Sequence, residues 1–133
     1  MPNRFVVRRT SMLSDSHAYS GFSSNDIAKA KEFYAQTLGL KVTEEYGMLT
    51  LHLAGDGKVI IYPKDNHEPA SFTVLNFPVE NIDQTVQGLA EAGIQFERYE
   101  GVNQDERGIH REYGPPIAWF KDPAGNVLSV IEG

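Results

Sequence analysis

The sequence contains no cysteine and no long hydrophobic segment, although 41% of its 133 residues are hydrophobic. The absence of cysteine excludes a disulfide framework and thiol chemistry, and it fits a reducing compartment. No apolar run approaches the roughly 18 residues that a membrane-spanning helix needs. The first 16 residues carry arginines but no continuous apolar core, so they do not resemble a secretion signal. We therefore expect a cytoplasmic protein that does not bind a membrane.

Basic residues are scarce relative to acidic ones. The chain has 12 lysines and arginines against 18 aspartates and glutamates, which gives a net charge of −6. This balance argues against nucleic acid as a partner, because nucleic-acid binding requires a basic surface that displaces counterions. A neutral or cationic small-molecule ligand is compatible with the charge. The acidic residues could equally serve only to keep the protein soluble.

What the sequence does contain is a pattern of strands and one helix that occurs twice. In the first copy, a strand at His17–Ser23 leads into the helix-capping segment Ser24-Asn25-Asp26. Apolar residues at helical spacing then run to Gly39, which occupies a helix C-cap position. Three strand-like runs separated by turn residues follow: Lys41–Tyr46, Met48–Leu53 and Lys58–Tyr62.

The second copy repeats this order. It has a helix that begins after the cap Asn81 and ends at Gly93, and the tight turn Asp122–Asn126 lies before its last strand. A polar segment, Gly101–Gly114, separates the middle strands. The strands predicted for this copy are Phe72–Val79, Ile94–Glu100, Ile117–Phe120 and Val127–Ile131.

The spacing of the two copies indicates a duplication. The predicted caps Asn25 and Asn81 lie 56 positions apart, and Gly39 and Gly93 lie 54 apart. We predict an α+β fold of two tandem βαβββ modules whose mixed sheets form a cup-shaped cavity with the helices outside. Such a cup is a natural site for a small ligand. A single domain would cover residues 17–133, with module one at about 17–64 and module two at about 71–133, after an N-terminal arm of residues 1–16.

Two local motifs resemble a known superfamily. Residues 25–40 contain Asn-Asp-Ile, Ala30, Phe33-Tyr34 and Leu38-Gly39-Leu40, and they are similar to the D-L-x-x-A-x-x-F-Y-x-x-x-L-G block of vicinal-oxygen-chelate domains, the glyoxalase, bleomycin-resistance and dioxygenase fold. Residues 117–126, IAWFKDPAGN, resemble the closing A-x-F-x-D-P-D-G-N hairpin of these domains. The resemblance extends from about His17 to the C-terminus. It implies the fold but not one function, because the superfamily includes isomerases, dioxygenases, transferases and drug-binding proteins.

The resemblance also indicates where a metal would bind. Metal-dependent members direct His, Glu or Gln side chains into the cup from the first and last strands of each module. The corresponding residues here are Tyr19, Ile61, Val74 and Ser129. Valine and isoleucine cannot bind a metal, a serine hydroxyl is a weak ligand, and tyrosine is used only occasionally. We therefore expect no metal and no other cofactor at the usual site, while His17 and His52 keep a displaced metal site open.

Without a metal, the cup is expected to offer aromatic, polar and apolar contacts. Trp119 lies opposite Ser129 if the strands pair across the Asp122–Asn126 turn, although a core position for Trp119 is an equal alternative. The segment Gly101–Gly114 is long enough to be a lid, with His110 and Tyr113 as its contact residues, or else a solvated loop. We assign no catalytic residue. The predicted ligand-binding residues are Tyr19, His52, Ile61, Val74, Tyr113, Trp119 and Ser129.

Two functions follow as hypotheses. The first is a metal-independent protein that binds a small aromatic or cationic molecule. The alternative is a glyoxalase-type lyase or isomerase, or a dioxygenase, with a non-standard metal or acid–base site in which His52 is the general base. Relatives often dimerise, sometimes with the cup completed across the interface, so the resemblance also implies a homodimer.

Overall fold

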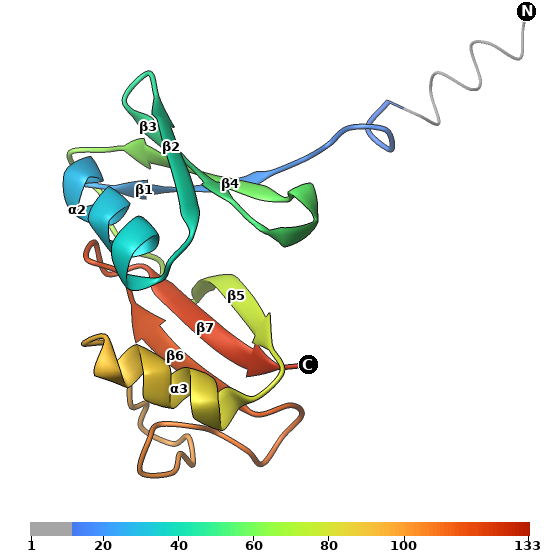
Figure 1. Ribbon diagram of the computed structural model, residues 1–133, viewed down its shortest axis with the longest axis vertical. Coiled ribbons are helices and arrows are strands. Elements are labelled where there is room, and N and C mark those ends of the chain that lie inside the picture. Colours follow the sequence, from blue (N-terminus) through green and yellow to red (C-terminus); the bar gives the residue numbers. More distant parts are fainter. Residues whose placement is uncertain (1–11) are drawn as a thin grey trace, which may run out of the picture.

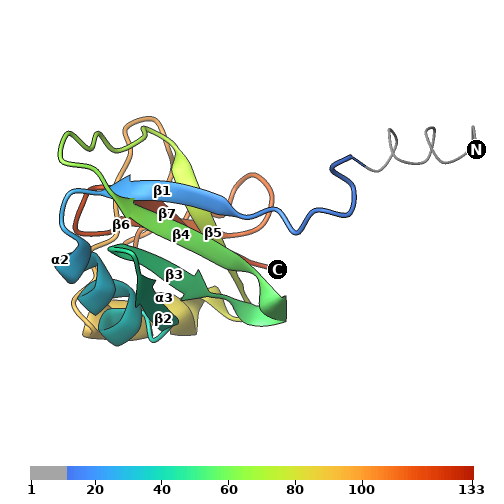
Figure 2. The ribbon, with the colours of Figure 1, turned by 90° about the horizontal axis from the view of Figure 1, so that it is seen from above.

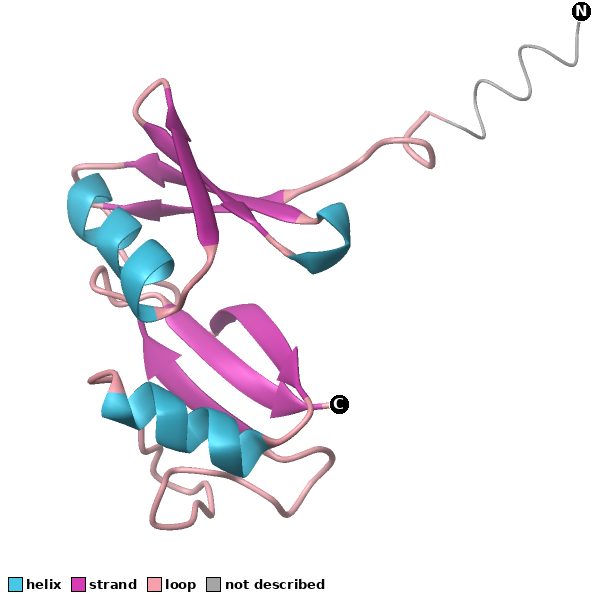
Figure 3. Ribbon diagram, in the orientation of Figure 1, coloured by secondary structure: helices cyan, strands magenta, loops and turns pink. Residues whose placement is uncertain are grey.

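The chain folds into two mixed β-sheets, each accompanied by one α-helix (Figures 1, 2 and 3), which confirms the predicted α+β class. The computed structural model describes residues 12–133, so most of the predicted N-terminal arm lies outside the described residues. Sheet A has the strand order β1-β4-β3-β2, and sheet B has the order β5-β7-β6. The elements are β1 (Ser20–Ser24), α2 (Ile27–Glu32), β2 (Lys41–Glu45), β3 (Met48–His52), β4 (Lys58–Pro63), β5 (Thr73–Val79), α3 (Ile82–Glu91), β6 (Ile117–Lys121) and β7 (Val127–Glu132).

Helix α2 begins one residue later than predicted. Its N-cap is Asp26, whose carboxylate accepts a hydrogen bond from the Lys29 amide at 3.0 Å, and not Asn25. The helix continues as a wider π-helical turn, Phe33–Thr37, closed by the hydrogen bond from the Leu38 amide to the Phe33 carbonyl. The predicted C-cap glycine is confirmed, because Gly39 has a φ of 74°. In the second unit, Asn81 caps α3 as predicted.

Sheet B lacks the strand that was predicted at Ile94–Glu100. This prediction was wrong: only a single bridge, between Phe96 and Phe120, and the bond from the Glu97 amide to the Trp119 carbonyl hold the segment to β6. Beyond Glu97 the segment turns away because the Gln104 side chain takes its backbone groups, accepting from the Tyr99 amide and donating to the Glu97 carbonyl. Sheet B therefore has three strands where sheet A has four.

A single hydrophobic core holds the two units together. Sheet residues in it come from the face that the helix of each unit covers, for example Leu51 and Ile61 of sheet A and Phe120 and Val130 of sheet B. Between the units, a small apolar hollow of about 160 Å³ lies beside Leu38, Leu40, Phe77, Val79, Leu89, Phe120 and Val130. Within one chain the units thus turn their helix-covered faces toward each other.

The described helices are also informative about membranes. None of the helices between residues 12 and 133 has the length and apolar character needed to cross a bilayer.

Candidate functional site

Each sheet has a second face that its own helix does not cover, which we call the outer face. Alternation along the strands assigns residues to it, because paired residues share a face and neighbours along a strand do not. The outer face of sheet A carries Gly21, Ser23, Thr50, His52, Lys58, Ile60 and Tyr62. The outer face of sheet B carries Asn76, Pro78, Ile117, Trp119, Ser129 and Ile131.

Ile61 was expected on the cup-facing side of sheet A, and this expectation was wrong. It pairs with Phe22 on β1 and Leu49 on β3, and it is fully buried in the core beneath α2. The reason is the two-residue period of a strand, since a shift of one position exchanges the faces. The neighbours Ile60 and Tyr62 occupy the outer face instead.

The other two predicted residues of the first unit lie at the outer face of sheet A. Tyr19, immediately before β1, is 60% exposed, and the ammonium of Lys58 lies 5.3 Å from its ring centroid. His52 is half-buried, and its Nε2 lies 2.8 Å from the hydroxyl of Thr43. No contact joins His52 to His17, which is exposed. This face therefore carries an exposed aromatic ring, an ammonium group and an imidazole.

In the second unit, the predicted pairing of Trp119 with Ser129 is confirmed. Both lie on the outer face of sheet B, and Trp119 is half-buried there, not a member of the core. Ser129 is fully buried and its hydroxyl donates to the amide oxygen of Asn76 on β5. Val74 lies in a bulge of β5, is partly buried and packs against the hydrophobic core.

Trp119 belongs to a row of four neighbouring aromatic rings. Tyr99 meets it edge to face with ring centroids 5.5 Å apart, and the imidazole of His110 lies 6.3 Å from it. Tyr113, which is 81% exposed, lies 6.0 Å from His110. Burial, with a smaller contribution from the Glu97 carboxylate, raises the pKa of Tyr99, so its hydroxyl remains protonated. We call Tyr99, His110, Tyr113 and Trp119 the aromatic cluster.

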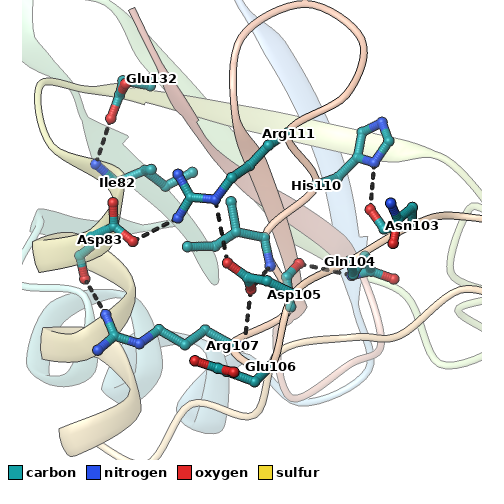
Figure 4. A network of polar contacts seen from close by, with 12 residues as sticks. Ile82, Asp83, Asn103, Gln104, Asp105, Glu106, Arg107, His110, Arg111 and Glu132 are labelled. Carbon is teal, nitrogen blue, oxygen red and sulfur yellow. Dashed lines mark hydrogen bonds and ion pairs between the residues drawn. The ribbon is translucent and has the colours of Figure 1, made fainter.

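The loop Gly101–Gly114, seen in Figure 3 as the long pink segment between α3 and β6, is firmly attached to α3. Figure 4 shows Arg111 between two carboxylates, at 2.6 Å from Asp83 on α3 and 3.3 Å from Asp105 within the loop. Asp105 also accepts hydrogen bonds from the amides of Arg107 and Ile109, each at 2.9 Å. The side chain of Ile109 is only 1% exposed. This part of the loop is therefore a fixed support, and Tyr113 lies beyond its last anchor.

The donor atoms for a metal are few. Among residues 12–133, no three His, Asp or Glu side chains lie close enough together to hold a metal ion. On the outer faces, the described parts of β1, β4, β5 and β7 carry no histidine or carboxylate, and the only imidazole that a sheet A strand presents is that of His52. A divalent transition metal needs three or more such donors, so these residues do not fit one.

Some site residues were not predicted from the sequence. Tyr99 falls in the strand predicted at Ile94–Glu100, and neither Tyr99 nor Asn76 is among the predicted ligand-binding residues. Asn76 could have been found, since it stands at a polar position within an otherwise apolar strand. The position of Tyr99 depends on the Gln104 side chain bonds, which no sequence pattern indicates.

Comparison with known proteins agrees with the fold. Residues 18–130 match the model of the Glyoxalase/Bleomycin resistance protein/Dioxygenase superfamily. The glyoxalase family protein from Enterococcus faecalis is 26% identical, with a TM-score of 0.64 over 91% of this chain and 99% of that one. The fold is also similar to TnmS3, an antibiotic binding protein from Streptomyces sp. CB03234 (21% identity, TM-score 0.65, 90% and 98% covered). A lactoylglutathione lyase from Agrobacterium tumefaciens shares the fold too (19% identity, TM-score 0.65, 89% and 94% covered).

Proposed function

This chain belongs to the Glyoxalase/Bleomycin resistance protein/Dioxygenase superfamily, and from that premise we propose that it is a metal-independent protein that binds a small aromatic or cationic molecule. The observation that carries the proposal is the aromatic cluster around Trp119, on a sheet face that its helix does not cover. Flat rings with polar edges favour planar ligands and cations. TnmS3, an antibiotic binding protein of similar fold, supports a binding role.

The donor set supports the metal-independent part of the proposal. In the superfamily, a metal is held by side chains of the first and last strands of each unit. Here Tyr19 and Ser129 stand at two of those positions, and the outer face of β4 offers Ile60 and Tyr62. These groups provide hydroxyls and an alkyl chain but no imidazole or carboxylate. We accordingly assign binding, and no metal-assisted reaction, to the site.

We further propose that the cup forms between two copies of the chain. Within one chain the core lies between the helix-covered faces, so the helix of neither unit packs on an outer face. Exposed aromatic residues such as Tyr19 (60%) and Tyr62 (41%) remain on the outer face of sheet A. A two-fold axis would place this face over the aromatic cluster of the second copy, and vice versa, so that both faces are covered in one step. The homodimer would thus contain two equal sites in the cytoplasm.

The single tryptophan allows a direct test. A panel of planar antibiotics and aromatic amines is titrated against the full chain while the fluorescence of Trp119 is recorded. We expect at least one compound to quench the fluorescence saturably. After long incubation with the protein, this compound should be recovered quantitatively and chemically unchanged. As a control, the same titration of Tyr46→Ser should give the result of the parent chain, since Tyr46 is 93% exposed in the β2–β3 turn. Conversion of the bound compound would refute the binding role, and a panel without any binder would refute the proposal as a whole.

A further inference from the structure

The imidazole of His110 has one fixed nitrogen and one free nitrogen. Its Nδ1 lies 2.7 Å from the backbone carbonyl oxygen of Asn103. A carbonyl oxygen only accepts hydrogen bonds, so Nδ1 must carry the proton. In the neutral ring, Nε2 is then an unprotonated acceptor. Figure 4 shows this second nitrogen pointing away from the loop network, and no partner for it is found among the described residues.

The backbone of His110 is held from three directions. Its own amide and carbonyl pair with Ile117 at 2.8 and 3.0 Å, which places it on the same face as Ile117 and Trp119. On one side, Ile109 is buried and its amide donates to Asp105. On the other side, Arg111 is bound to Asp83 on α3. This degree of support is what preorganised binding groups have and solvated loop residues lack.

We propose that Nε2 of His110 is the hydrogen-bond acceptor of the ligand site and selects flat aromatic molecules that carry an N–H donor, such as aryl amines or amidines. The imidazole that carries this acceptor lies near the rings of Trp119 and Tyr113, so we infer that one ligand can stack and donate at the same time. The fixed Nδ1–H prevents the ring from turning its donor toward the ligand, which disfavours ligands that offer only acceptors. This inference rests on the proposed binding function and names the ligand chemistry of that site.

The first arm of the test needs no ligand. Two-bond ¹H–¹⁵N correlation spectra of the full chain distinguish the two neutral tautomers of a histidine. We expect the Nδ1–H tautomer for the neutral ring of His110. The Nε2–H tautomer would overturn the proposal.

The second arm uses the cations of proflavine and acridine orange in which the ring nitrogen carries a methyl group. Proflavine then has two amino groups as its N–H donors, and acridine orange, the same ring system with both amino groups fully methylated, has none. The variants are His110→Gln, which keeps an amide at the position of Nε2, and His110→Phe, which keeps a ring without an acceptor. For the parent chain we expect tighter binding of proflavine than of acridine orange. His110→Phe should weaken proflavine binding about tenfold or more and erase this preference, because a hydrogen bond to a charged ligand is lost. His110→Gln should stay within about threefold of the parent. Melting curves establish that both variants are folded.

The outcomes separate this proposal from the binding function itself. If His110→Phe binds proflavine as tightly as the parent chain, or if His110→Gln loses as much as His110→Phe, the acceptor role is overturned. The acceptor role is also overturned if the parent chain binds only planar compounds without N–H donors. In that case the general binding function still stands. If no planar compound binds at all, both fall together.

Discussion

At the scale of residues, one buried carboxylate joins the two sequence motifs. Asp122 is 5% exposed and accepts a hydrogen bond from the hydroxyl of Tyr34 at 2.7 Å. It accepts another from the side-chain amide of Asn126 at 2.9 Å. The Asn126 side chain also donates to the carbonyl of Ser23 on β1. Burial, followed by the charge of Asp122, raises the pKa of Tyr34 well above its usual value, so this hydroxyl is always a donor. Tyr34, Asp122 and Asn126 of the two motifs thus connect the units.

Removal of the Tyr34 hydroxyl should therefore weaken the junction between the units. We expect Tyr34→Phe to lower the free energy of unfolding by roughly 1–3 kcal/mol, because a buried charged acceptor loses its partner. Urea titration followed by circular dichroism measures this loss. Tyr46→Phe, at an exposed position, is the matched control and should be neutral. Equal stability of the two variants would show that Asp122 does not depend on Tyr34.

Isolated residues were the hardest to place from the sequence. The cap Asp26, the bulge at Val74 and the inward Ile61 each differ by one position or one face from what the pattern suggested. A pattern gives the period of a strand, but the face is set by its register with neighbouring strands. The pairing of Trp119 with Ser129 succeeded because the tight turn between them fixes that register.

At the scale of elements, a polar loop replaces a strand of the second unit. The helices and the strands with strong apolar patterns were predicted to within a few residues, since hydrophobic period and cap residues determine them. Ile94–Glu100 has a similar pattern, but tertiary side chain bonds from Gln104 overrode it. The loop gains its order from Asp105 and Arg111.

The loop should make stability depend on pH through Asp105. Burial alone would raise the pKa of Asp105, but hydrogen bonds from the Ile109 and Arg107 amides and the Arg111 guanidinium outweigh it and lower the pKa. Because the pKa of Asp105 is lower in the folded state, its carboxylate contributes fully to the free energy of unfolding above the unfolded-state pKa. This contribution is lost as the pH falls through the folded-state pKa. We expect the parent chain to be more stable than Asp105→Asn at pH 7, and this difference to shrink near about pH 3. Urea unfolding at the two pH values tests this, and a constant difference would contradict it.

Two glycines of this region should respond oppositely to alanine. Gly108 has a φ of 92°, and an added Cβ would lie 3.1 Å from Cβ of Phe96, so Gly108→Ala should destabilise the fold by about 1–2 kcal/mol. Gly88 lies within α3 with open space at its Cβ position, so Gly88→Ala should stabilise the fold by about 0.5–1 kcal/mol. The melting temperatures of the two variants, compared with that of the parent chain, measure both effects. A stabilising Gly108→Ala would show that the loop conformation is not fixed.

At the scale of the whole molecule, the duplication was visible in the sequence, but the relative placement of the units was not. Both possible pairings of the units, within and between chains, satisfy the same strand pattern. Within one chain, the hydrophobic core lies between the helix-covered faces. The outer face of sheet A keeps exposed aromatic residues such as Tyr19 and Tyr62.

Mixing of variants tests the cup formed by two copies. A chain with Tyr19→Ala and His52→Ala lacks the contribution of sheet A, and a chain with Trp119→Ala lacks that of sheet B. On its own, each of these two variants should bind only weakly any ligand that the panel identifies. After joint refolding, about a quarter of the sites should recover parent affinity, because each mixed dimer contains one site with both intact faces. Equilibrium dialysis measures the recovered sites. Absence of recovery would place the whole site within one chain.

The anchoring of the loop has a consequence for the fate of the protein in the presence of proteases. Trypsin cleaves after an arginine whose side chain is free to enter its specificity pocket, and the loop region offers Arg98, Arg107 and Arg111. All three guanidinium groups are engaged: Arg98 donates to the carbonyls of Asp105 and Glu106, Arg107 to the carbonyl of Asp83, and Arg111 to the Asp83 carboxylate. Cleavage therefore has to wait for local opening of the loop from α3. The region with the least regular structure should be digested slowly, at a rate set by the strength of its ion pairs and therefore faster in high salt.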